Sequence, residues 1–335
     1  MVRVRRLLNN STMDPNKILP MTYLFARELY KAGIANNWTP EEISMQQDCE
    51  QWKSPTALSP EERRLILWNL GFFATAESLT ANNIVLAVYK HITNPECRQY
   101  LLRQAFEEAI HTDTFIYCCD SLGLDPDEIY TMYQTIPSIK QKDDFVIELT
   151  ASIFDPNFTT QGEANIKAFI HDLIGYYVIM EGIFFYAGFA MILALKRQNK
   201  MIGIGQQFEY IMRDESLHLA FGCELINTIL LEHPEVWTLD FQQEIVSLIQ
   251  QAVVLEQQYA YDACPSGILG INAQQFCDYV EYIADRRLER LGLQKVYHKE
   301  NPLLWLSEST DLRKETNFFE RRPTEYQIGG ALEWD

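Results

Sequence analysis

Two short segments of the sequence combine carboxylates with an imidazole at helical spacing. They are Glu107 to His111 and Asp214 to His218, and in each a Glu precedes a His by three residues. Residues three apart lie about one helical turn apart on neighbouring positions, so such a pair can bind one ion. Glu107 and Asp214 stand four residues before their histidines, which is also a neighbouring position. Spacing alone leaves open which acid of each pair would bind a metal and which would orient a histidine.

Two further glutamates lie inside strongly apolar segments, Glu77 in residues 71–80 and Glu181 in residues 176–185. A buried carboxylate needs a partner, and these segments offer few basic residues. The order Glu, Glu-x-x-His, Glu, Glu-x-x-His is typical of di-metal carboxylate four-helix bundles. Four glutamates and two divalent ions would be neutral together, and oxygen ligands with one imidazole per ion suit iron and manganese. The competing interpretation pairs Glu77 and Glu181 with buried Lys or Arg.

Helical periodicity predicts the elements that would position these residues. One helix begins at Pro60 and continues towards Ile92, and the next opens at Asn94-Pro95 and ends at Gly123. Further helices are predicted over residues 127–135, 140–153, 163–198, 204–232, 239–264 and 272–291. Alternating Val/Ile-rich strands are absent from the pattern, so the predicted fold is all-α. Residues 1–60 are rich in proline and predicted to be irregular; residues 301–335 are polar and predicted to form a flexible tail after a 1–300 domain.

Composition excludes several classes of function. The 335 residues include 28 Lys+Arg and 46 Asp+Glu, and 28 − 46 = −18 argues against nucleic acid as a partner. The N-terminus lacks a secretory apolar region, and seven cysteines without a pairing pattern suggest the cytoplasm. Residues 176–195 are long and apolar enough to span a membrane, but Glu181 lies among them, so we predict a buried core helix and no membrane association.

Over nearly all of its length the chain resembles the radical-generating small (beta) subunit of class I ribonucleotide reductases. The motifs that carry this resemblance are residues 71–77, 103–111, 180–182 and 213–218. It implies a ferritin-like helical bundle with a di-metal carboxylate site, and it resolves the choice between Glu107 and Glu108. The implied ligands are Glu77, Glu108 and His111 for one metal and Glu181, Glu215 and His218 for the other.

Two positions depart from the commonest pattern of that family. Most members have Asp where this chain has Glu77, and a radical-bearing Tyr where it has Phe115. Both departures resemble subclass Ic, which uses a manganese–iron centre, activated by O₂, and keeps the oxidising equivalent on the metals. Phe115 as ordinary core packing fits the pattern equally well. Tyr117 lies about 120° around the helix from His111, which makes it a poor replacement radical site.

The resemblance also implies a route for electrons. Asp214 would link His111 to Trp38, although an ordinary core or turn role for Trp38 is the alternative. Tyr210 resembles a tyrosine that passes electrons to the site during activation, and Tyr326 resembles a mobile tyrosine that relays oxidation between subunits. Residues 331–335 resemble the anchor that docks on the large subunit.

The predicted function is therefore that of a ribonucleoside-diphosphate reductase beta subunit, a homodimer that starts nucleotide reduction in a large (alpha) subunit. A manganese–iron ligand-binding oxidase of the same superfamily and a ferritin-like iron-sequestering protein are the alternatives. The sequence leaves open which metal occupies which position, and whether diphosphates or triphosphates are reduced.

Overall fold

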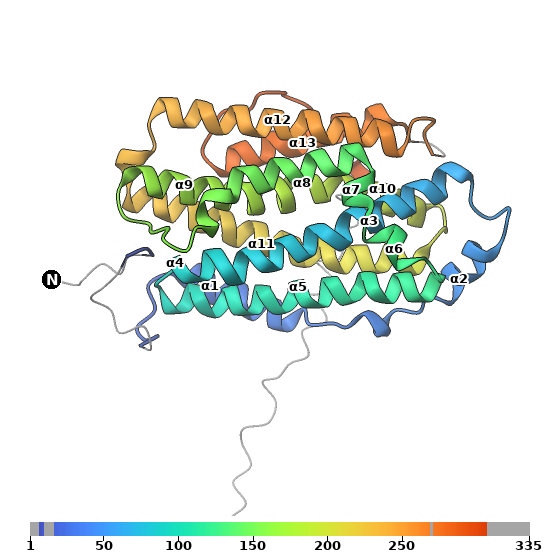
Figure 1. The fold of residues 1–335 in the computed structure, drawn as a ribbon, viewed down its shortest axis with the longest axis horizontal. Helices are drawn as coiled ribbons and strands as arrows, with labels where there is room; N and C mark the ends of the chain where they lie inside the picture. Colours follow the sequence, from blue (N-terminus) through green and yellow to red (C-terminus); the bar gives the residue numbers. More distant parts are fainter. Residues whose placement is uncertain (1–6, 10–16, 269–270, 307–335) are drawn as a thin grey trace, which may run out of the picture.

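A computed structural model describes residues 7–9, 17–268 and 271–306. In these ranges the fold is helical throughout: there is no β-strand, and only two isolated bridges join Leu8 to Ile92 and Ile268 to Ile271. The long helices run roughly along the long axis of the molecule (Figure 1). The predicted all-α fold is confirmed.

The elements follow one another with short connections. The α-helices are α1 Leu24–Ala35, α2 Gln46–Lys53, α3 Pro60–Asn83, α4 Tyr89–His91, α5 Pro95–Leu122, α6 Pro126–Ile129, α7 Met132–Thr135, α8 Pro137–Thr150, α9 Glu163–Leu173, α10 Phe185–Arg197, α11 Ile202–Glu232, α12 Leu239–Ala263 and α13 Ala273–Arg290. The 3₁₀ turns are η1 Pro40–Glu42, η3 Ala151–Phe154 and η5 Pro234–Val236, and η2 Ile84–Val88 and η4 Ile174–Phe184 are π-helical.

Local sequence signals account for the helix ends. Ser59 caps α3 by accepting from the Glu62 backbone N–H, and Asn94 caps α5 by accepting from Cys97. Gly123 ends α5 in the left-handed conformation, with φ 66°, which glycine adopts without steric cost. These are the starts and the stop that the sequence predicted for the two helices.

The prediction of an irregular segment before residue 60 was wrong. Helices α1 and α2 lie within it, because Pro20, Pro40 and Pro55 fall between the helices and leave their interiors intact. The predicted helix over 127–135 was also wrong in part. It is two separate turns, α6 and α7, divided at Tyr130 and Thr131.

A four-helix core of α3, α5, η4 and α11 forms the centre of the molecule. Helix α5 contacts α3 and α11, and η4 contacts α3 and α11, so each member has two neighbours in the set. Helix α1 packs on α5 and α11, while α12 and α13 pack on each other and on η4. The centre of the bundle is therefore covered on several sides.

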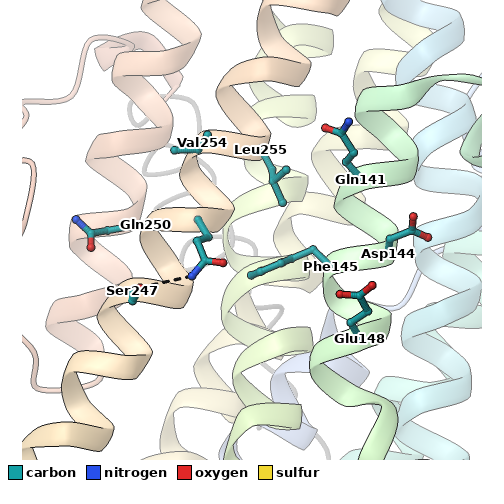
Figure 2. A pocket seen from close by; sticks show the side chains of 9 residues that line it. Gln141, Asp144, Phe145, Glu148, Ser247, Gln250, Val254 and Leu255 are labelled. Carbon is teal, nitrogen blue, oxygen red and sulfur yellow. Dashed lines mark hydrogen bonds between the residues drawn. The ribbon is translucent and has the colours of Figure 1, made fainter.

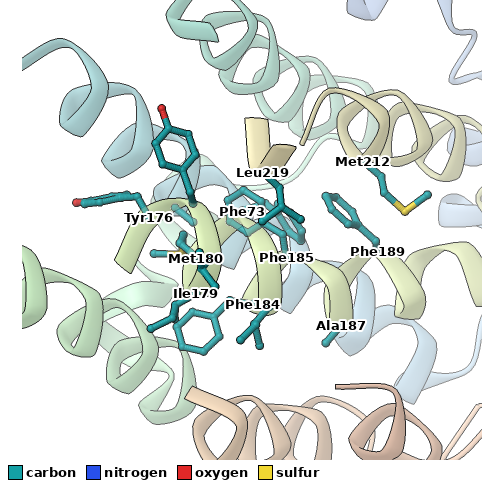
Figure 3. Packing of buried hydrophobic residues seen from close by; sticks show 14 of the residues in the cluster. Phe73, Tyr176, Ile179, Met180, Phe184, Phe185, Ala187, Phe189, Met212 and Leu219 are labelled. Carbon is teal, nitrogen blue, oxygen red and sulfur yellow. The ribbon is translucent and has the colours of Figure 1, made fainter. Parts of the chain in front are cut away.

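The most apolar segment of the chain is this bundle's core. Helices α9, η4 and α10 form one continuous helix over Glu163–Arg197, long and apolar enough to cross a membrane, but 94% of its most apolar window is buried. Figure 3 shows Phe184, Phe185 and Phe189 of this helix packed among neighbouring side chains. The predicted core helix is what the structure contains.

Packing continues past the last long helix, since Leu303 and Leu306 are buried. The division into a 1–300 domain and a 301–335 tail stays a prediction. On the surface, a groove of about 670 Å³ lies between α8 and α12, with Phe145 and Leu255 lining it (Figure 2).

Candidate metal centre

The six predicted ligands come together inside the bundle. Each side chain is fully buried, at 0% exposure. Helix α3 contributes one of them, α5 two, η4 one and α11 two: Glu77; Glu108 and His111; Glu181; Glu215 and His218. Their ligand atoms form two overlapping groups in which every atom lies within 4.8 Å of the others, Glu77, Glu108, His111 and Glu215 in one and Glu108, Glu181 and His218 in the other.

Two of the glutamates lie between the imidazoles. Glu108 places one oxygen 3.1 Å from His218 Nδ1 and the other 3.7 Å from His111 Nδ1. Glu215 does the same from the facing helix, at 3.2 Å from His111 Nδ1 and 3.4 Å from His218 Nδ1. Each of these two carboxylates therefore faces both imidazoles. The assignment of three ligands to each metal stays a prediction.

The other two glutamates serve one half each. Glu77 Oε2 lies 3.4 Å from His111 Nδ1. Glu181 groups with Glu108 and His218 and accepts a hydrogen bond from Gln104 Nε2 at 3.3 Å. The arrangement of two shared and two terminal carboxylates, with one imidazole at each end, is a donor set for two adjacent ions.

Glu181 is presented from π-helical backbone, a form that occurs mostly as short insertions at functional sites. The next residue, Gly182, is closely packed: an added Cβ would lie 3.0 Å from the Tyr177 carbonyl oxygen and 3.1 Å from Leu219 Cδ1. Its own carbonyl accepts from Arg287 Nε at 2.7 Å. Sequence periodicity did not predict the π segment.

Each histidine is oriented by an acid from the other histidine-bearing helix. Asp214 of α11 lies 3.4 Å from His111 Nε2, and Glu107 of α5 lies 2.9 Å from His218 Nε2. These contacts leave Nδ1 of both imidazoles facing the centre. The acids whose role spacing left open therefore occupy supporting positions, as is usual for carboxylates behind metal-bound histidines.

Helix α1 fixes one of these supporting acids through Arg103. The guanidinium donates to Glu107 Oε1 at 2.9 Å, to the Gly33 carbonyl at 3.0 Å and to Asn37 Oδ1 at 2.9 Å. Gly33 allows this close approach, because a Cβ there would lie 2.7 Å from Glu107 Oε1. Sequence analysis missed this network, because the helix that carries Gly33 was not predicted.

A second network supports Glu181. Gln104 donates to Glu181 and accepts from the Tyr177 hydroxyl at 2.8 Å, and all three side chains are buried. Gly222 makes space for the tyrosine, since a Cβ at that position would lie 2.2 Å from Tyr177 Cγ. One feature of the sequence indicated this contact: Gln104 lies one helical turn before Glu108.

Burial and the crowding of carboxylates around two imidazoles shift the pKa values of the centre. Burial raises the pKa of both Glu77 and Glu181 well above the usual range, and Glu215 adds to both effects. For Glu108 burial acts in the same direction, but the two imidazoles hold its pKa below the usual value. Burial would lower the pKa of His111 and His218, yet the surrounding carboxylates raise it.

Six buried carboxylate oxygens of the centre make no hydrogen bond to any residue that the structure describes: Glu77 Oε1, both oxygens of Glu108, Glu181 Oε2 and both oxygens of Glu215. His218 Nδ1 has none either. Buried polar atoms are normally satisfied, and two imidazoles are too few cations for four buried glutamates. The donor set therefore fits two divalent ions, which would neutralise four glutamates.

The structure also places Trp38 and Tyr210 beside the centre. Trp38, 2% exposed, donates from Nε1 to Asp214 Oδ2 at 2.7 Å. Its ring lies 5.2 Å from that of Tyr210 and 6.4 Å from the His111 imidazole. Although burial acts in the opposite direction, the hydrogen bond from His111 and the charge of Arg213 hold the pKa of Asp214 below its usual value.

Phe115 is fully buried among other phenyl rings. Its ring lies 5.8 Å from that of Phe73 in a stacked arrangement and 5.9 Å from that of Phe208. Tyr117, by contrast, is only partly buried and donates to the Ile43 carbonyl of the N-terminal segment at 3.1 Å. Tyr326 and residues 331–335 lie outside the described residues.

Fold and site together define a class: a helical bundle with a buried di-metal carboxylate centre. The match to known families is more specific. Residues 15–302 match the family described as ribonucleotide reductase, small chain, and the chain belongs to that family. Its relatives are named as ribonucleoside-diphosphate reductase subunits, which are oxidoreductases.

Individual relatives cover most of the chain. The beta subunit of ribonucleoside-diphosphate reductase from Chlamydia pneumoniae is 58% identical over 333 residues, 99% of this chain and 96% of that protein. Subunit M2 from Homo sapiens is 31% identical over 94% of this chain and 76% of its own length. The R2 subunit structure from Clostridium botulinum superimposes with a TM-score of 0.82 at 26% identity, covering 91% of this chain and 93% of that one. The predicted ferritin-like fold is thus confirmed.

Proposed function

We propose that this chain is the radical-initiating subunit of a ribonucleoside-diphosphate reductase of the manganese–iron type, subclass Ic. The observation that carries the proposal is the buried, hydroxyl-free surroundings of Phe115. The family resemblance puts Phe115 at the position of the radical tyrosine, and it is enclosed by rings that have no hydroxyl, including Phe73 and Phe208. Glu77, at the other departure from the common pattern, belongs to the same donor group as His111.

A manganese–iron pair, activated by O₂, would supply the oxidising equivalent. The six ligands, Glu77, Glu108, His111, Glu181, Glu215 and His218, would hold one ion of each kind. Glu107 and Asp214 keep the imidazoles in orientation, and the surrounding phenyl rings exclude water. Residues of this chain thus orient the imidazoles and keep water away from the site.

Asp214 has a second task in this proposal. Its Oδ2 accepts the indole N–H of Trp38 and faces the His111 ring. When Trp38 is oxidised its N–H becomes strongly acidic, and Asp214 Oδ2 is the atom placed to accept that proton. Tyr210, in ring contact with Trp38, extends this pathway towards the surface.

The test is a combined measurement on the O₂-activated protein: manganese and iron content, electron paramagnetic resonance and turnover with a large subunit. We expect activity to require both metals, without a stable tyrosyl radical. Full activity from iron alone with a long-lived tyrosyl signal would refute the manganese–iron assignment.

The proposed partners are a second copy of the chain and a large subunit, in the cytoplasm. Helix α5 exposes an apolar stripe of Leu102, Phe106 and Ile116, at 59%, 52% and 46% exposure, which would suit a homodimer. A monomer at micromolar concentration in sedimentation experiments would contradict this.

The large subunit would dock on the tail, residues 301–335, with Tyr326 as the relay. Deleting residues from 325 onward should abolish both docking and turnover. Tyr326→Phe should abolish turnover while docking is retained, because only the redox-active hydroxyl is removed. Full turnover in the deletion variant would show that the tail has neither role, and full turnover in Tyr326→Phe would exclude the relay through Tyr326.

A further inference from the structure

A pocket of about 440 Å³ lies between α11, α13 and residues 301–306. Its wall includes three arginines of α13, Arg286, Arg287 and Arg290, together with Tyr186 and Tyr282. None of the six predicted metal ligands lines it. The three guanidinium groups concentrate positive charge on a chain whose net charge is −18.

These arginines have no carboxylate partner among the residues that the structure describes. The acidic residues of the same helix are used elsewhere. Asp285 accepts from the backbone N–H groups of Val296, Tyr297 and His298, and Glu289 pairs with Lys295 at 3.0 Å. The positive charge of the pocket is therefore not neutralised by its own helix.

Arg287 is the most deeply placed of the three, at 3% exposure. Its Nε donates to the Gly182 carbonyl, its guanidinium carbon lies 4.5 Å from the Tyr186 ring centre, and its Nη2 is buried without a hydrogen-bond partner in the described chain. Burial lowers the pKa of this guanidinium, and the neighbouring Arg290 acts in the same direction. A buried cation in this setting is stabilised by a negative charge.

We propose that this pocket binds an oxyanion, a phosphate or carboxylate group of a small molecule. The planar fork of an arginine matches the geometry of both groups, and charge-assisted hydrogen bonds of this kind are strong. Arg286 and Arg290 are exposed at the mouth, where they can meet an entering anion, and Arg287 lies at the inner wall. The proposal does not depend on the redox function proposed above.

The experiment is a calorimetric titration of the full chain with inorganic phosphate, pyrophosphate and succinate in low salt. We expect saturable binding of one anion per chain. Preference for pyrophosphate would identify a phosphoryl ligand, and preference for succinate a carboxylate ligand. Absence of saturable binding for all three anions would overturn the proposal.

A pair of matched double variants separates a built site from general attraction. Arg286→Gln/Arg290→Gln removes two charges at the mouth and leaves buried Arg287 in place, so folding should be unaffected. Arg27→Gln/Arg98→Gln removes two charges from arginines that stack on Tyr30 and Tyr89 and do not line the pocket. We expect at least a tenfold loss of affinity in the first variant and little change in the second. Equal losses in both would refute a specific site.

Discussion

Trp38 and Asp214, 176 residues apart in the chain, are joined by a buried hydrogen bond of 2.7 Å from Nε1 to Oδ2. The same carboxylate oxygen lies 3.4 Å from His111 Nε2. Asp214 therefore connects an aromatic ring at the edge of the bundle with a histidine whose opposite nitrogen faces the carboxylate cluster. The N-terminal segment that carries Trp38 thus becomes part of the site.

Replacing Trp38 by Phe should separate electron relay from metal binding. The phenyl ring keeps much of the packing but has no N–H for Asp214 and is harder to oxidise. We expect turnover with a large subunit to fall at least 100-fold while metal content is unchanged. Trp52→Phe is the matched control, because Trp52 stacks on Arg63 away from the cluster. Equal turnover in both variants would exclude a relay through Trp38.

Replacing His111 by Gln should reduce metal content without unfolding the bundle. The variant removes a nitrogen donor from the group that contains Glu77, Glu108 and Glu215. We expect occupancy to fall at least tenfold by elemental analysis, with an unchanged helical circular dichroism spectrum. His171→Gln, in α9, is the control, since His171 pairs with Glu244 and lies outside the cluster. Normal metal content in the His111 variant would contradict its assignment as a ligand.

Replacing Gln104 by Leu should weaken the half of the centre that contains Glu181. The change keeps the volume but removes the amide that Glu181 accepts from, and supporting contacts of this kind are worth about 10- to 100-fold in metal affinity. Tyr177→Phe is the companion variant, because it removes only the hydroxyl that Gln104 accepts from. Competition titrations with a chelator should give a larger loss for Gln104→Leu. The opposite order would show that Tyr177 is the more important contact.

Replacing Asp172 by Asn should change how stability depends on pH. Burial raises the pKa of Asp172 to about 8, against a smaller opposite effect of the hydrogen bond from Asn83. In the unfolded chain an aspartate titrates near pH 4, so the folded state keeps a proton that the unfolded state loses. In the parent chain the contribution of Asp172 to the free energy of unfolding should therefore fall as pH rises from about 4 to about 8, by up to about 1.4 kcal/mol per pH unit.

The Asn side chain has a similar shape and does not titrate in this range. We would measure urea unfolding at pH 5, 6.5 and 8, at equal metal content. The free energy of unfolding of the variant should rise relative to that of the parent chain as pH rises. Buried carboxyls that both proteins share, such as Asp143, cancel in this comparison. A stability difference that is the same at all three pH values would refute the prediction.

Helical spacing was sufficient to place each Glu-x-x-His pair on one face of its helix, whereas the choice between Glu107 and Glu108 came from the family resemblance. A regular helix converts spacing into direction, so Glu108 and His111 could be placed on one face from their numbers alone. The helix starts predicted at Pro60 and at Asn94-Pro95 were also local, since the capping side chains of Ser59 and Asn94 are adjacent in sequence to the helices that they cap.

The contacts that sequence reasoning missed are those between distant segments. Arg103 reaches Gly33 and Asn37 across 70 and 66 residues, and no local pattern encodes such a meeting. The buried ion pair of Lys142 and Glu256, at 2.7 Å, is of the same kind. The π-helical turn at Glu181 was missed for another reason: tertiary packing, and not side-chain periodicity, decides where a helix accommodates an extra residue.

Helices α5 and α11 are interlocked through their acids, because Glu107 orients His218 while Asp214 orients His111, and Glu108 and Glu215 each face both imidazoles. An ion at either position would therefore be held by carboxylates that also face the other position. We expect loading to be cooperative, with a sigmoidal titration curve and little of the singly occupied form. The choice of metal at one position would then constrain the choice at its neighbour.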